Sequence, residues 1–336
     1  MDVNKNIIHW LNISLFFLLM MISLGGATRL TNSGLSMVIW KPVTGIIPPI
    51  TSIEWNESFD NYKNFPQFKK TKPEMGLSDY KYIYYWEYMH RLLGRFIGFL
   101  FVIPFIFFLS KGYLNKILIK KLIFVFLLGG VQGFIGWFMV RSGLVDNPQV
   151  SHYRLAMHLV IAFFILGYIY NIKLSLIANR KSEVLHYNYF NILINIIIGL
   201  VFIQIIYGAF NAGLKTVETI NTFPFFGNEI IPLDILSSND TWRVFFENHF
   251  AVQLVHRYLA LIILILSVHF CLKINLTQNR INYYAQYLML IVVFQCLLGI
   301  LTLNAHAPIV FSLSHQLLAS VLILLVFKIK HILKFK

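Results

Sequence analysis

The chain has 336 residues, of which 57% are hydrophobic, 16% are aromatic and only 12% are charged. Soluble proteins carry roughly 25% charged residues, so this composition excludes a soluble Rossmann or barrel enzyme. The 28 lysine and arginine residues against 14 acidic residues give a net charge of +14. Because the basic residues cluster in short loops between long apolar runs, the charge indicates membrane topology and no nucleic-acid binding.

The apolar runs are about 20 residues long, which is the length that a helix needs to cross a bilayer. We therefore predict an all-α integral membrane protein. The predicted membrane-spanning helices are eight, at residues 9–27, 84–109, 122–140, 153–170, 191–212, 250–272, 284–303 and 309–327. The first is near signal-peptide length, but Asn12 lies early in it and no ordinary hydrophilic domain follows, so we expect it to be retained.

The distribution of basic residues predicts the orientation of these helices. Basic connections alternate with poorer ones, and the basic residues are Lys111, Lys116, Lys120, Lys121, Lys173, Arg180, Lys181, Lys273, Arg280, Lys328, Lys330, Lys334 and Lys336. These segments and both termini are predicted to be cytoplasmic. The start of the chain is not Arg-rich and Ser-rich like a transit peptide, so a bacterial inner membrane fits best.

Two outer connections, residues 28–82 and 213–249, are long and rich in Pro, Gly and aromatic residues. We expect them to fold as caps, the alternative being that they are tolerated insertions. Each half of the chain also follows one order: a span, a long outer loop, a helix that begins near a His-Arg dipeptide, and two further spans. This order predicts two duplicated four-helix bundles, in residues 1–180 and residues 181–336.

Four histidines fall inside predicted spans, namely His90, His158, His256 and His315. Counting to the next inner lysine places them on the order of 20 to 31 Å from the inner boundary, at about 1.5 Å per residue. A single buried histidine is more often hydrogen-bonded to a neighbouring helix. Four at related positions of a repeated unit favour bis-imidazole ligation of haem iron, with one pair in each half. The other histidines lie near helix ends or in loops and are expected not to be ligands.

The neighbours of these histidines differ between the halves. Glu87 stands three residues before His90, whereas Gln253 stands three before His256. A carboxylate beside a haem can accept a proton or stabilise positive charge on a substrate, which an amide cannot. The alternative is a structural ion pair between Glu87 and Arg91 at i+4.

Two further features bear on haem binding. Arg91 and Arg257 directly follow candidate ligands and could pair with haem propionates, or simply extend to the membrane interface. Gly94 and Gly98 leave the helix face below His90 free, for a macrocycle or for helix packing. The two cysteines, Cys271 and Cys296, lie in or at the end of apolar runs, so neither a disulfide nor a Cys-x-x-Cys site is predicted.

The chain resembles the haem A synthase (Cox15/CtaA) family over nearly its entire length. The segments that carry the resemblance are 26–37 (GATRLTNSGLSM), 86–91 (WEYMHR), 132–140 (QGFIGWFMV), 142–144 (SGL), 153–158 (YRLAMH), 221–224 (NTFP), 247–248 (EN) with Gln253, 256–257 (HR) and 314–316 (SHQ). Each is short, but together their order and spacing are specific. No cysteine lies outside the apolar runs, so the chain resembles the branch without an outer-loop cysteine pair.

The resemblance implies an enzyme that oxidises the C8 methyl of haem O to a formyl group, with water as oxygen source, giving haem A for cytochrome c oxidase. It implies that His256 and His315 hold a resident haem b and that His90 and His158 bind the substrate haem. It also implies that Glu87 is catalytic. Contact with haem O synthase and self-association would follow from family habit, while the electron acceptor stays unnamed.

Two other classes of protein share part of this pattern. A diheme b-type electron-transfer protein has the histidine pairs but no need for a carboxylate beside one pair only. A transporter built from two repeats would also carry intramembrane polar residues, but would bind no iron.

Overall fold

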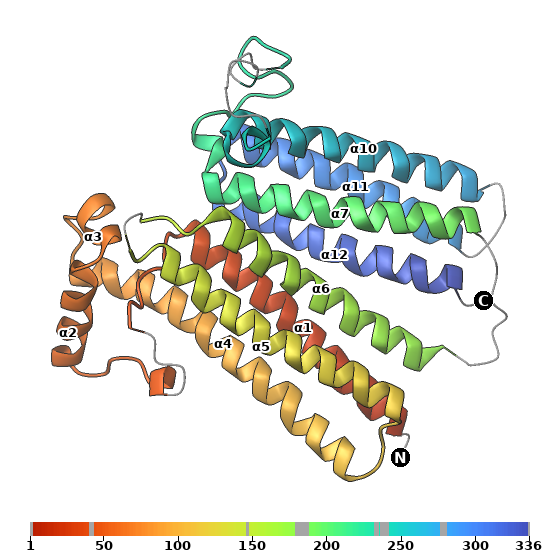
Figure 1. Ribbon diagram of the computed structural model, residues 1–336, viewed down its shortest axis with the longest axis horizontal. Helices are drawn as coiled ribbons and strands as arrows, with labels where there is room; N and C mark the ends of the chain where they lie inside the picture. The colour runs from red at the N-terminus through yellow and green to blue at the C-terminus, as the bar shows by residue number, and fades with distance from the viewer. Residues whose placement is uncertain are drawn as a thin grey trace. The chain divides into compact units, whose positions relative to one another are not determined.

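The computed structural model describes residues 3–39, 44–145, 148–178, 188–231, 235, 242–275 and 281–334. Eight of its helices are long and apolar enough to cross a membrane. They are α1 (Val3–Leu30), α4 (Leu77–Ser110), α5 (Lys116–Ser142), α6 (His152–Ile177), α7 (Asn188–Leu214), α10 (His249–Asn275), α11 (Ile281–Asn304) and α12 (Ile309–Lys334) (Figure 1). Each predicted span lies within one of these helices, so the predicted all-α membrane fold is confirmed.

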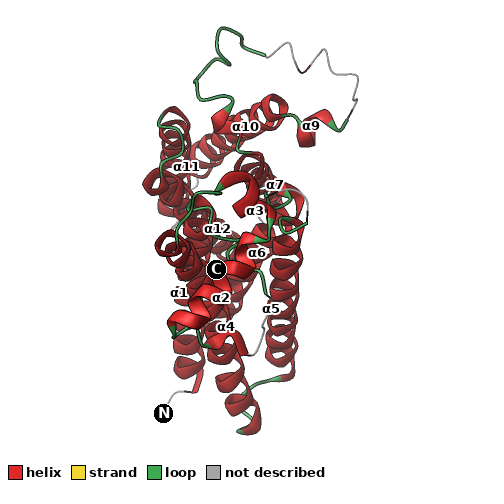
Figure 2. Cartoon of the chain, turned by 90° about the vertical axis from the view of Figure 1, so that its left-hand side faces the viewer, coloured by secondary structure: helices red, strands yellow, loops and turns green. Residues whose placement is uncertain are grey.

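The described chain consists of helices and connecting loops (Figure 2), with one isolated β-bridge between Phe226 and Glu229. Helices satisfy every backbone hydrogen bond within the segment itself, which the bilayer interior requires because it offers no water. Large apolar side chains such as Phe99, Ile103 and Ile265 are more than 60% exposed, as expected for side chains that face lipid.

The helix α4 begins at Leu77, well before the predicted start at residue 84. Gly76 is its N-cap, and Asp79 places a negative charge in the first turn, where it complements the helix dipole. The added turns are aromatic and are covered by the preceding outer segment. The search for apolar runs long enough to cross a membrane missed these turns because they lie before such a run.

That outer segment contains η1 (Thr44–Ile46), α2 (Ser52–Lys63) and α3 (Pro66–Thr71). A capping box between Thr51 and Glu54 begins α2. Hydrogen bonds from the backbone N–H groups of Thr51 and Ile50 lower the pKa of Glu54, so this cap is charged near neutral pH.

Aromatic side chains of α2 and of the first turns of α4 form one buried cluster. Its members are Met37, Trp55, Phe59, Tyr62, Tyr80, Ile83, Tyr84 and Tyr88. Burial, and secondarily the negative charge of Glu87, raise the pKa of Tyr62, so its phenol stays protonated and donates to Gln67 Oε1 at 3.0 Å. Gln67 in turn donates to the carbonyl of Asn32 at 3.0 Å, which ties the cluster to the loop after α1.

The second outer segment contains η2 (Thr216–Glu218) and α9 (Val244–Glu247), with residues 232–234 and 236–241 outside the described part of the chain. Whether these segments cap the membrane part stays a prediction.

Contacts divide the chain into two compact units. Residues 16–158 form one, and residues 1–15 with residues 159–336 form the other. In the second unit α10 packs on α7 and α11, and α12 packs on α11 and α7, which closes a four-helix ring (Figure 1). In the first unit α4 packs on α5 and on α2. The predicted boundary between residues 180 and 181 lies outside the described residues, and the duplication stays a prediction.

Candidate functional site

Each of the four intramembrane histidines lies against a glycine of another helix. In the unit of residues 16–158, a Cβ built on Gly25 of α1 would stand 3.0 Å from His90 Nε2 on α4. A Cβ built on Gly136 of α5 would stand 3.1 Å from His158 Cε1 on α6. Even a methyl group at either glycine would press on the imidazole, which would have to shift by a few tenths of an ångström.

The same contact recurs twice in the other unit. A Cβ on Gly208 of α7 would lie 3.3 Å from His256 Cε1 on α10, and one on Gly299 of α11 would lie 3.2 Å from His315 Cε1 on α12. In each unit the two histidines come from different helices and are close enough to interact electrostatically. The structure therefore places one pair of these histidines in each unit, and ligation of a haem by either pair stays a prediction.

The residues present fit the axial ligands of a haem. The Nδ1 atoms of His158, His256 and His315 are buried and lack a hydrogen-bond partner. Buried polar atoms normally have a partner, and exceptions often mark a functional site. Among the described residues no group of three or more His, Cys, Asp or Glu side chains gathers to hold a bare metal ion. Pairs of imidazoles instead match the two axial positions of a haem iron.

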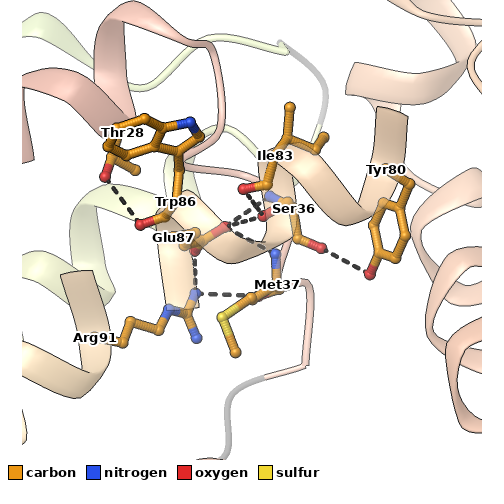
Figure 3. Close-up of polar contacts among 8 residues, drawn as sticks. All are labelled: Thr28, Ser36, Met37, Tyr80, Ile83, Trp86, Glu87 and Arg91. Atoms are coloured by element: carbon orange, nitrogen blue, oxygen red, sulfur yellow. Dashed lines mark hydrogen bonds and ion pairs between the residues drawn. The ribbon is translucent and has the colours of Figure 1, made fainter. Parts of the chain in front are cut away.

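Glu87 is the most constrained polar side chain near these pairs, with only 2% of its surface exposed. Figure 3 shows its partners. Oε2 accepts hydrogen bonds from Ser36 N at 2.7 Å, Ser36 Oγ at 2.7 Å and Met37 N at 2.8 Å. Oε1 accepts one from Arg91 at 2.5 Å. All four bonds are donated to the carboxylate, as its ionised form requires. The ion pair indicated by the i+4 spacing is thus present.

The equivalent position in the other unit is built with the opposite polarity. Gln253 Oε1 accepts from Arg257, and Gln253 Nε2 donates to the carbonyl of Ile220 at 3.0 Å and to Thr216 Oγ1 at 3.4 Å. The loop after α7 therefore offers acceptors to an amide, where the loop after α1 offers N–H donors to a carboxylate. The two halves share geometry but differ in charge.

Both arginines that follow the histidines bind loop carbonyls. Arg91 donates to Met37 O at 3.1 Å, and Arg257 donates to Thr222 O at 2.6 Å and to Pro224 O at 3.1 Å. The guanidinium of Arg257 also lies 4.0 Å from the ring centroid of Phe226. These contacts fix the loops after α1 and α7 against the helices that carry His90 and His256. Contact with a haem propionate stays a prediction for both.

Several site residues were missed by sequence reasoning. Ser36 and Met37 belong to a quoted family motif, but nothing in the sequence said that their N–H groups would meet Glu87. Three glutamines of the other helices, Gln132, Gln204 and Gln295, also contact the histidine-bearing helices. A Gln-x-x-x-Gly pattern repeated at these positions was the available signal.

Two of the histidines expected not to be ligands, His269 and His249, contact hydroxyl groups. His269 Nε2 and the hydroxyl of Tyr189 are 2.6 Å apart, and His249 Nδ1 lies 3.1 Å from Thr219 Oγ1. Gly94, expected to leave room for a macrocycle or for another helix, faces the methyl of Met21, which lies 3.3 Å from where its Cβ would stand. At Gly94 the free helix face therefore serves helix packing.

Within the described residues, eight helices long and apolar enough to cross a membrane, with partly buried histidines packed against glycines of neighbouring helices, define a multi-pass membrane protein. The family model described as "cytochrome oxidase assembly protein" (COX15-CtaA) matches residues 8–327, and the chain belongs to this family. This confirms the resemblance seen in the sequence.

Relatives named "Heme A synthase" align over nearly the whole chain. The protein of Flavobacterium psychrophilum is 40% identical over 96% of both chains. That of Flavobacterium johnsoniae is 41% identical over 94% of both chains. That of Wolbachia pipientis is 38% identical over 95% of this chain and 90% of its own.

Proposed function

We propose that this protein is a haem A synthase, which oxidises the C8 methyl of haem O to a formyl group with water as oxygen source. Membership of the family and the names of its relatives support this activity. The observation that carries it is the asymmetry between the two histidine pairs. One pair has a buried carboxylate, Glu87, one turn away, and the other has the amide of Gln253. A simple electron carrier has no use for this difference.

In this proposal His90 and His158 would hold the iron of the substrate haem, and His256 and His315 would hold that of a resident haem b. The glycine cradles and the buried, unpartnered ring nitrogens support both assignments. The resident haem b would supply one-electron transfer away from the substrate. Arg91 and Arg257 would contact the propionates in the outer half of the membrane.

Conversion of a methyl to a formyl group consumes one water and releases four protons and four electrons. As electrons leave the methyl carbon of haem O, positive charge develops there, and water attacks the electron-poor carbon. Glu87 is held by four donors with its charge fixed near His90, so it stabilises that charge and receives protons. The donors from Ser36 and Met37 keep the carboxylate from turning away.

We propose a location in a bacterial inner membrane with both termini cytoplasmic. The lysines at the ends of α5 and α12 and the bacterial relatives support this orientation and location. The protein would then receive haem O within the lipid bilayer, with haem O synthase and a second copy of this chain as candidate partners. Its electron acceptor would lie outside the chain.

Incubation of the purified protein with haem O and an artificial electron acceptor tests the activity. We expect haem A, separated by chromatography and identified by mass, together with low-spin haem spectra. Two low-spin haems without any haem A would favour a diheme electron carrier, and a protein that takes up no haem would fit a transporter.

A glycine substitution tests directly whether a haem-binding histidine needs the glycine against which its imidazole packs. Replacing Gly136 by leucine is expected to displace His158, because even a Cβ there would stand 3.1 Å from the imidazole. Gly133→Leu on the same helix is the control, since no atom lies within 4 Å of its Cβ position. We expect Gly136→Leu to lower the haem bound by the N-terminal pair several-fold, measured by the pyridine haemochrome assay. Equal haem contents in the two variants would contradict the cradle.

A further inference from the structure

Three of the four histidines are tethered by a glutamine from a neighbouring helix. Nε2 of Gln132 donates to the main-chain carbonyl of His158 at 3.0 Å. Gln204 makes the same bond to His256 at 2.9 Å, and Gln295 makes it to His315 at 3.0 Å. Each glutamine stands four residues before the glycine on which its histidine rests. One turn of helix therefore supplies both an anchor and a cradle.

The fourth histidine, His90, does not follow this pattern. Four residues before Gly25 stands Met21, whose thioether has no N–H to donate, so the bond to the carbonyl of His90 cannot form.

A second residue changes together with the glutamine. The tethered histidines are each followed four residues later by alanine, at Ala162, Ala260 and Ala319. His90 is followed by Gly94, whose Cβ would lie 3.3 Å from the Met21 methyl. A glutamine on one helix thus occurs together with an alanine on the histidine helix three times, and a methionine occurs together with a glycine once. Because Gly94 leaves space for the methyl of Met21, the two residues differ together from the other three pairs.

The imidazole of His90 is also oriented differently from the other three. His158, His256 and His315 each turn Cε1 toward their glycine, whereas His90 turns Nε2 toward Gly25. The two orientations are related by a half-turn of the imidazole about its Cβ–Cγ bond.

We infer that Met21 makes His90 the exchangeable axial ligand, through which haem O enters and haem A leaves. This rests on the proposed function, in which His90 and His158 hold the substrate. Both ligands of the resident haem are anchored, by Gln204 and Gln295, as a cofactor that stays bound requires. In the substrate site His158 is anchored in this way, whereas His90 is not anchored and can dissociate from the haem iron. Met21 is thus a positioning residue that acts by leaving the carbonyl of His90 with its helical hydrogen bond but without a side-chain donor.

The test restores the missing tether in the full-length protein loaded with haemin. Met21→Gln is combined with Gly94→Ala to rebuild the pair found in the other units, and Met21→Leu with Gly94→Ala is the matched control without an amide. Transfer of haem to apomyoglobin is followed for the N-terminal site, identified as the kinetic phase lost in His90→Ala. A net hydrogen bond of about 1 kcal/mol predicts release about fivefold slower with glutamine only.

Binding of carbon monoxide to the reduced protein provides a readout that general stabilisation would not move. An axial ligand that lets go admits carbon monoxide, so we expect the N-terminal haem of the wild type to bind it and the glutamine variant to bind it more slowly. The reverse variant, Gln132→Met, is expected to speed release by loosening His158.

Equal release from the glutamine and leucine variants, with Gln132→Met also unchanged, would overturn the inference and leave the proposed function intact. Absence of any haem on His90 and His158 in the wild type would instead overturn the site assignment on which the proposed function depends.

Discussion

Replacing Glu87 by glutamine is expected to stop conversion of haem O to haem A while both histidine pairs still bind haem. General acid-base groups contribute about 10²- to 10⁴-fold to rates, and this carboxylate also stabilises developing positive charge. The amide preserves the size of the side chain and an oxygen for Arg91. It carries no charge, and its NH₂ group faces the N–H donors of Ser36 and Met37. Chromatography of extracted haems after incubation with haem O measures the effect.

Gln253→Ala is the matched control for that variant, because it removes a buried polar side chain from the equivalent position of the other half. It breaks the contacts with Arg257 and Ile220 but changes no charge. We expect it to keep haem A formation within a few-fold of the wild type. Normal conversion by Glu87→Gln, or equal losses in both variants, would remove the catalytic role from Glu87.

Alanine at His256 or at His315 is expected to remove the resident haem from the purified protein. In the proposed function each imidazole would supply one of the two bonds from the protein to the haem iron, and even outer-shell partners of metal ligands are worth about 10- to 100-fold in affinity. The haem content of the C-terminal site should therefore fall at least about tenfold, and its low-spin spectrum should disappear. The pyridine haemochrome assay and the Soret band measure both.

His249→Ala is the control on the same helix as His256. Its ring contacts Thr219 at the start of α10 and rests on no glycine of the described residues. We expect this variant to keep its haem. An unchanged low-spin spectrum in both His256→Ala and His315→Ala would mean that the C-terminal pair does not hold a haem.

The membrane fold was readable from the sequence because a single physical demand dominates it. A bilayer accepts only segments that are apolar over about 20 residues and satisfy their own backbone hydrogen bonds, so composition along the chain gives the spans. The charge of the short loops is also a local property of the sequence, and it predicts the orientation of the spans. The histidines and the contrast between Glu87 and Gln253 stood out since polar residues are rare in hydrocarbon.

Helix ends were less accessible to this reasoning. The first turns of α4 are held by Trp55, Phe59 and Tyr62 of α2, which are far from them in the chain and were invisible to a count of apolar length. The extra turns carry Ile83, whose carbonyl accepts a hydrogen bond from the hydroxyl of Ser36, beside Glu87. An outer segment thus fixes the base of the candidate site.

Taken by itself, the sequence determined which side chains are unusual and on which helices they lie. Tertiary structure alone decided their partners: the N–H groups of Ser36 and Met37 for Glu87, a glycine beside each histidine, and a glutamine amide for each of these histidines except His90. The physical reason is that burial of one polar group in a membrane is a local property of its segment. The hydrogen-bond partner of that polar group is a donor or acceptor from another helix, and only the packing of the helices brings this partner into place.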